Sequence, residues 1–256
     1  MWKLNRQYLL AVMMMTTLIC GIIHEANARE FLFYSTVDTP LVFKSESDGS
    51  VTGITPEILD LLMKELNIPY RIVIATTSRT LKDARDGKAD MILTISKNKE
   101  RMEYLLYPEE SYVELSWNFF IRKTDEGKIH FQELKDIKGL RVGATKDSSY
   151  TPEFWKSDLK LDISTQHTNQ ISKLLANRFD IVPMPTMLTL YEEKQKGRLN
   201  AIAYLPKPLK SKSYYNAFSI ASDHPEKKRL ISKYDEIIRR MKADGSISRI
   251  FNKYLK

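Results

Sequence analysis

The sequence predicts an α/β protein made of two units. Apolar runs that suit strands alternate with segments of helical spacing, first between residues 30 and 95 and again between residues 115 and 205. Each series contains the same helix-start signal, Thr55-Pro56-Glu57 in the first and Thr151-Pro152-Glu153 in the second. This alternation with short connections is typical of parallel sheets covered by helices. Two units of this size match ordinary domains better than one large sheet does.

The first series begins and ends with a strand. Glu30 to Thr36 is an apolar, aromatic run, and apolar residues recur at helical spacing from Thr55 until Pro69 closes the segment. The elements expected after it are a strand at 70–75, a helix at 78–86 that Gly87 terminates, and a strand at 89–95.

The second series starts with a predicted strand at 115–121. Its other strands are expected at 140–145, 161–165, 180–184 and 201–205, and its helices from 151 onward and at 169–177 and 187–196. The C-terminal part is predicted to contain a strand at 214–221, an amphipathic helix at 224–243 and a short helix to Lys256.

Residues 1–28 have the features of a secretory signal peptide. Lys3 and Arg6 precede an uncharged apolar run at 9–23, and Ala26-Asn27-Ala28 supplies the small residues that a signal peptidase recognises. Cleavage after Ala28 would release a periplasmic protein. An uncleaved membrane anchor is the alternative, but the run is shorter than the about 20 residues that a spanning helix needs.

Composition excludes several kinds of chemistry. The only cysteine, Cys20, lies in the predicted signal peptide, so the exported chain has no thiol for disulfides, metal thiolates or nucleophilic catalysis. The formal net charge of the chain is +8, but basic and acidic residues interleave, which indicates a solvated surface and not a nucleic-acid groove. We therefore expect no nucleic-acid partner.

The sequence predicts no catalytic residue, metal site or cofactor. The histidines of the exported chain, His130, His167 and His224, lie far apart, and each is expected at the surface. No zinc-protease or serine-hydrolase motif and no glycine-rich phosphate loop is found. An acid–base pair of scattered carboxylates stays open as an alternative.

Ligands of α/β sheets bind at the carboxyl ends of strands. Four polar loops stand at such ends, after Thr36, Ile95, Thr145 and Met184. In the second of them, Arg101 could offer its planar guanidinium to a carboxylate. The alternative is an exposed arginine that pairs with Glu100 or Glu103.

The loop at 146–150 is the second place that suits an anion. It precedes a predicted helix N-terminus, where free amides and the helix dipole favour negative charge, and a plain helix cap is the alternative. Trp117, Tyr150 and Trp155 are aromatic candidates both for the cleft and for the core.

Several strings, taken in order, resemble the family 3 extracellular solute-binding proteins of amino-acid ABC transporters. Those similar to the family's first lobe are Gly53-Ile54-Thr55-Pro56-Glu57-Ile58, Gly87-Lys88-Ala89-Asp90, Lys99-Glu100-Arg101, Tyr107-Pro108 and Ser111-Tyr112. Those similar to its second lobe and C-terminus are Leu134-Lys135-Asp136-Ile137-Lys138-Gly139, Val142-Gly143, Asn177-Arg178-Phe179-Asp180 and Ala243-Asp244-Gly245-Ser246-Ile247, with Ile250 and Tyr254. The resemblance covers nearly all of the exported chain.

The resemblance implies the type II periplasmic binding protein fold, in which two α/β lobes close on a ligand. Hinge strands would lie near 112–115 and 213–216. The first lobe would comprise residues 29–112 and 216–256, and the second lobe residues 113–215. The implied partners are a small carboxylate-bearing ligand and an inner-membrane ABC permease, and the implied state is a monomer without a cofactor.

The resemblance also implies a binding site. Its residues would be Arg101, Ser96, Asn98, Asp38, Ser148, Ser149, Tyr150 and Pro185. In the family, the arginine clamps the carboxylate of the ligand. Pro185 stands where amino-acid binders usually carry the acid that receives the ligand's ammonium. An α-amino acid would therefore need another acceptor, Asp38 or Asp147, because a buried ammonium requires compensation.

We expect from these residues a periplasmic protein that captures a small carboxylate-bearing solute, an amino acid or a related compound, for ABC-type uptake. It is not expected to be an enzyme. Two alternatives on the same fold are a lyase similar to cyclohexadienyl dehydratases and a periplasmic sensory module.

Overall fold

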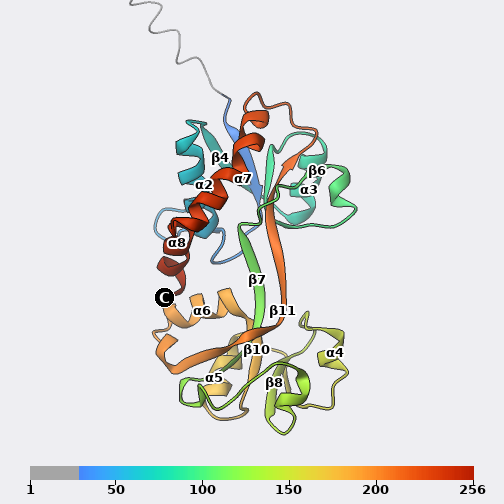
Figure 1. Cartoon of the computed structure of the whole chain (residues 1–256), viewed down its shortest axis with the longest axis vertical. Helices are drawn as coiled ribbons and strands as arrows, with labels where there is room; N and C mark the ends of the chain where they lie inside the picture. The colour runs from blue at the N-terminus through green and yellow to red at the C-terminus, as the bar shows by residue number, and fades with distance from the viewer. Residues whose placement is uncertain (1–28) are drawn as a thin grey trace, which may run out of the picture.

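The computed structural model describes residues 29–256, which form two lobes joined by two long strands (Figure 1). The predicted signal peptide, residues 1–28, lies outside the described residues. The connecting strands are β7 (Val113–Arg122) and β11 (Ile202–Ser219), which pair antiparallel from Arg122 and Ile202 to Val113 and Tyr214. The α/β class and the two-lobed architecture are thus confirmed.

The first lobe is built on three parallel strands, β1 (Phe31–Ser35), β4 (Tyr70–Ile74) and β5 (Met91–Ser96), with β1 in the middle. Side chains of β1 alternate between two cores. Phe31 and Phe33 pack under α2 (Ile54–Glu65), α7 (Lys227–Ala243) and α8 (Ser246–Leu255). Tyr34 packs on the other face, with residues of α3 (Thr77–Arg85).

The second lobe contains the parallel pair β8 (Arg141–Thr145) and β9 (Lys160–Ser164), and β10 (Val182–Pro185), which pairs antiparallel with β7. Its helices are α4 (Pro152–Trp155), α5 (Gln170–Leu175) and α6 (Thr186–Gln195). Gly143 allows the close packing of this lobe, because a Cβ there would lie 2.6 Å from the buried ring of Phe179.

Short elements complete the chain. They are the two-residue strands β2 (Phe43–Lys44), β3 (Val51–Thr52) and β6 (Leu105–Leu106), and the 3-10 turns η2 (Arg101–Glu103), η3 (Lys123–Asp125), η4 (Leu134–Ile137), η5 (His167–Asn169) and η6 (Leu199–Ala201). In residues 29–256, no helix is both long and apolar enough to cross a membrane.

The C-terminal strands differ from the sequence prediction. The runs at 201–205 and 214–221 are parts of one strand, β11, whose register with β7 shifts around Pro208. Pro206 and Pro208 lie between the two predicted runs, and a proline cannot donate a ladder hydrogen bond. The register shift accommodates Pro208 without ending the strand.

Helix α2 begins differently from the prediction. Its N-cap is Gly53, and the hydroxyl of Thr55, expected to cap the helix, instead bonds the hydroxyl of Tyr112 at 2.8 Å. The amides of Ile54 and Thr55 donate to the carbonyls of Pro40 and Leu41, at 3.1 and 2.9 Å. These bonds fasten the loop after β1 to the helix end.

Candidate functional site

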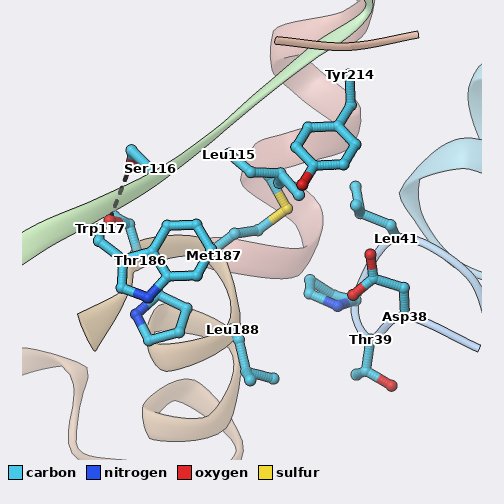
Figure 2. A pocket seen from close by; sticks show the side chains of 12 residues that line it. Asp38, Thr39, Leu41, Leu115, Ser116, Trp117, Thr186, Met187, Leu188 and Tyr214 are labelled. Carbon is cyan, nitrogen blue, oxygen red and sulfur yellow. Dashed lines mark hydrogen bonds between the residues drawn. The ribbon is translucent and has the colours of Figure 1, made fainter. Parts of the chain in front are cut away.

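Two neighbouring cavities lie beside the hinge strands. The first, here the polar cavity, has a volume of about 270 Å³ and is lined by Thr36, Asp38, Thr77, Thr80, Leu81, Ile92, Leu93, Thr94, Ile95, Ser96, Arg101 and Tyr214. The second, here the apolar cavity, measures about 310 Å³ and is lined by Asp38, Thr39, Pro40, Leu41, Leu115, Ser116, Trp117, Pro185, Thr186, Met187, Leu188 and Tyr214 (Figure 2). Asp38 and Tyr214 line both cavities.

The polar cavity lies where strand-end reasoning places a ligand. Arg101 follows the carboxyl end of β5, and its Nη1 donates to the carbonyl and to the hydroxyl of Ser96, at 2.9 and 2.7 Å. Among residues 29–256, Nη2 and Nε of Arg101 have no hydrogen-bond partner. One nitrogen therefore anchors the guanidinium, and its other donors are left for a ligand.

The surface alternative for Arg101 does not hold. Glu100 pairs with Arg85 on α3 at 2.8 Å, and within the described chain neither Glu100 nor Glu103 forms an ion pair with Arg101. The guanidinium of Arg85 also stacks on the ring of Tyr104, 4.2 Å from its centroid. Arg101 thus lies on the cavity side of its loop, half-buried.

The environment of Arg101 is built from neighbouring polar groups. The hydroxyl of Tyr107 donates to the same Ser96 carbonyl at 3.0 Å, and burial raises the pKa of Tyr107 to about 12. Asn98 does not line either cavity. Its side-chain oxygen accepts a hydrogen bond from the backbone amide of Arg101 at 2.8 Å and so fixes the turn that carries the arginine.

Asp38 lines the polar cavity from a different loop, the one that follows β1. Its backbone is clamped by reciprocal bonds with Val42, at 2.8 and 2.9 Å, which fixes the loop after β1. Its carboxylate has no ion pair and no hydrogen bond from any residue in 29–256. It is open to solvent in the cleft, yet the protein around it displaces part of its hydration, and this burial raises the pKa of its carboxyl.

The second lobe contributes the wall of the apolar cavity. Trp117 comes from β7, Pro185 from the end of β10, and Met187 and Leu188 from α6. Figure 2 shows the indole of Trp117 and the thioether of Met187 on one side and Asp38 on the other. Pro185 thus lines the apolar cavity, and its contact with a ligand stays a prediction. Tyr214, which lines both cavities, lies in the hinge segment implied at 213–216. It was not singled out as a site residue, because sequence spacing does not show which hinge side chains face a cavity.

The loop at 146–150 lies outside the linings of both cavities. Ser149 accepts hydrogen bonds from Lys210, through its carbonyl and, at 3.0 Å, through its hydroxyl. The carbonyl of Ser148 accepts the indole N–H of Trp155 at 3.3 Å. Contact of Ser148 or Ser149 with a ligand stays a prediction.

Tyr150 belongs to the core of the second lobe. It is buried, its hydroxyl donates to the carbonyl of Pro183 at 3.0 Å, and the amide of Thr145 donates to it at 3.2 Å. Its ring packs on Phe154 and Trp155. Sequence spacing cannot distinguish this role from a place in the cleft, because both need an aromatic residue after a strand end.

Residues 29–256 contain no group of three His, Cys, Asp or Glu side chains that could hold a metal ion. One histidine differs from its predicted surface position. His224 is buried, where its Nε2 meets the carbonyl of Arg29 at 2.8 Å and its Nδ1 accepts the amide of Glu226 at 3.1 Å. Both ring nitrogens therefore serve the structure.

The chain belongs to the bacterial extracellular solute-binding proteins, family 3, whose model matches residues 34–256. It is thus a solute-binding protein with a small-molecule ligand.

Individual relatives are distant. A probable histidine-binding protein of Campylobacter jejuni is 20% identical over 245 residues, covering 90% of this chain and 87% of the relative. The crystal structure of a polar amino acid ABC transporter substrate-binding protein from Streptococcus thermophilus has a TM-score of 0.75 at 17% identity, covering 88% of this chain and 86% of that one. An ancestral cyclohexadienyl dehydratase has a TM-score of 0.64 at 20% identity, covering 92% and 95%. At these identities the structures establish the fold and not the ligand.

Proposed function

We propose that this protein captures a small carboxylate-bearing solute, an amino acid or a related compound, between its lobes in the periplasm and delivers it as a monomer to an inner-membrane ABC permease. Residues 1–28 would direct export and be removed during it. Family membership supports the solute-binding role. The relatives named for amino-acid binding favour the proposed class of solute.

One observation carries the proposal. Arg101 lines the cavity at the carboxyl end of β5 with one nitrogen anchored on Ser96 and the rest of its guanidinium free of protein partners among residues 29–256. A planar, permanently charged fork held in this way suits a carboxylate. Ser96 supports that fork directly, whereas Asn98 acts on it through the backbone.

Closure of the lobes would complete the site. We place the lobe boundaries at 112/113 and 215/216, since β11 changes its partner from β7 to β5 at Tyr214. A ligand that touches both lobes favours the closed state by its differential affinity. Binding and not catalysis is the proposed outcome. An acid–base pair of carboxylates needs two such groups, and in the described chain Asp38 is the only carboxylate that lines either cavity.

Titration calorimetry on the chain from Arg29 to Lys256, with amino acids and small organic acids, tests the proposal. A carboxylate ligand should bind, and Arg101→Ala should weaken it by about 2–5 kcal/mol, since the ligand's carboxylate would be left buried and unpaired. Arg71→Ala is the matched control, because Arg71 is exposed on β4 and, among residues 29–256, forms an ion pair only with Glu30. Unchanged affinity in Arg101→Ala, or turnover of prephenate or arogenate, would contradict the proposal.

A further inference from the structure

Among the described residues, the second-lobe wall of the apolar cavity has no carboxylate that could receive an ammonium group. At the position implied for an acid stands Pro185, which carries neither charge nor a polar side chain. The hydroxyl of Thr186 is fully used. It donates to Oδ1 of Asn118 at 2.7 Å and accepts from the backbone amide of Asn118 at 3.1 Å. It also accepts from the hydroxyl of Ser116 at 3.1 Å (Figure 2). A hydroxyl has one donor and two lone pairs, so nothing of Thr186 remains for a ligand.

Lys210 gives the nearby edge of this wall a positive charge. Its Nζ bonds Ser149 and lies 4.1 Å from the centroid of the Trp117 ring. A second cation placed here would be repelled by it, since like charges destabilise one another where water is partly excluded. The second lobe is therefore unsuited to an ammonium group, because its wall lacks a carboxylate and the side chain of Lys210 carries a positive charge beside it.

The first lobe supplies the carboxylate that the second-lobe wall lacks. Asp38 presents a carboxylate without a partner among residues 29–256 at the junction of the two cavities, and Figure 2 shows that it faces across the apolar cavity toward Met187. Arg101 lines the same polar cavity, yet the two side chains form no ion pair with each other. One free anion and one free cation in a single cavity match the two charges of a zwitterionic head group.

The apolar cavity indicates the rest of the ligand. Among its described lining residues, Asp38 at the junction is the only charged one. Leu41, Leu115, Trp117 and Met187 surround the remaining space with apolar surface. A charged side chain entering there would lose its hydration without finding a partner, whereas an apolar one would gain from leaving water.

We propose that the solute is an α-amino acid with an uncharged, apolar side chain, whose carboxylate binds Arg101, whose ammonium binds Asp38 and whose side chain enters the apolar cavity. This inference rests on the proposed function and adds the chemistry of the ligand to it. The first lobe thus holds the whole head group, and the second lobe closes over the side chain. Asp38 takes the role that an acid at position 185 would otherwise have.

Matched ligands test the inference on the chain from Arg29 to Lys256. Calorimetry compares L-leucine, L-methionine and L-phenylalanine with their analogues that lack the amino group, 4-methylpentanoate, 4-(methylthio)butanoate and 3-phenylpropanoate. At least one amino acid should bind about 100-fold or more tightly than its analogue, because the analogue leaves the Asp38 carboxylate desolvated and unpaired. L-Histidine, L-lysine and L-glutamate should bind more weakly than that amino acid.

Asp38→Asn should reduce the affinity for the amino acid to that for its analogue and leave the affinity for the analogue unchanged or increased. Glu46→Gln removes the same charge from an exposed site in the same lobe and should change neither. Thermal melting confirms that each variant is folded.

Different failures have different meanings. Equal binding of an amino acid and its analogue overturns the role of Asp38 but leaves the carboxylate site of the proposed function standing, provided that Arg101→Ala abolishes both. Tighter binding of lysine, histidine or glutamate overturns the apolar side chain. Loss of discrimination in Asp147→Asn instead of Asp38→Asn overturns the assignment of the acceptor. Binding of none of these compounds overturns the inference, and if organic acids also fail to bind, the proposed function falls with it.

Discussion

Replacement of Tyr112 by phenylalanine should destabilise the protein at the root of its hinge. Tyr112 directly precedes β7 and is buried, and its hydroxyl bonds the hydroxyls of Thr55 on α2, at 2.8 Å, and of Thr94 on β5. Thr94 has a φ of 51°, an uncommon conformation for a β-branched residue, and its amide donates to Asn216 on β11 at 3.2 Å. One hydroxyl therefore ties the start of β7 to α2 and β5, next to the C-terminal part of β11.

The magnitude follows from the bonds lost. Phenylalanine keeps the ring but removes two hydrogen bonds, each with a net value of about 0.5–1.5 kcal/mol, and leaves the hydroxyl of fully buried Thr55 without its partner. The sum is about 2–3 kcal/mol. For a chain of this size, 1 kcal/mol lowers the melting temperature by about 2–4 °C, so we expect a decrease of about 4–12 °C.

Thermal melting followed by circular dichroism measures this decrease. Tyr104→Phe is the matched control, since the hydroxyl of Tyr104 is buried and lacks a hydrogen-bond partner among the described residues. It should melt close to the parent protein. A melting temperature of Tyr112→Phe no lower than that of Tyr104→Phe would show that the hydroxyl cluster does not stabilise the hinge root.

Two further predictions concern packing and charge. Gly143→Ala should lose about 1–3 kcal/mol of stability in urea titrations, because its Cβ would lie 2.6 Å from the Phe179 ring, and an unchanged midpoint would mean that the ring moves freely. Asp38→Asn should raise the melting temperature of the ligand-free protein at neutral pH. Burial raises the pKa of Asp38 in the folded protein above that in the unfolded chain. The ionised carboxyl therefore destabilises the folded state above the raised pKa, and this penalty is absent below the pKa of the unfolded chain. The difference between variant and parent, measured from pH 3 to 8, should vanish on acidification. Arg101, Tyr112 and Tyr214 are the other titratable groups near this carboxyl, and a difference that grows toward low pH would contradict the assignment.

A binding site that costs stability until it is filled fits a ligand-gated closure. The Asp38 carboxylate is kept partly dehydrated without a protein cation, and an ammonium in the cleft would remove that penalty. The same ligand would also join the lobes through the apolar wall. Affinity for the amino acid and stability of the empty protein are thus expected to change in opposite directions on substitution of Asp38.

Much of the fold could be predicted from the sequence because its signals are local. Helix and strand periods identified β1, α2, α3 and β5, and ordered strings of residues identified the family that the match to residues 34–256 establishes. The position of Arg101 after a strand end was also readable, since the carboxyl ends of strands in such sheets share one edge.

Other features were decided only by the tertiary structure, because they depend on contacts between residues far apart in the chain. Whether Arg101 faces the cavity or pairs with Glu100 at the surface depended on Arg85 of α3, which forms the ion pair with Glu100. Tyr150 became a core residue through a bond to Pro183, 33 positions away. The union of the last two predicted strands into β11 required β7 beside them, and the meeting of Asp38 and Arg101 in one cavity required two loops that adjacent strands bring together. Local sequence sets which conformation each segment prefers, but which side chains share a cavity is set by how the segments pack.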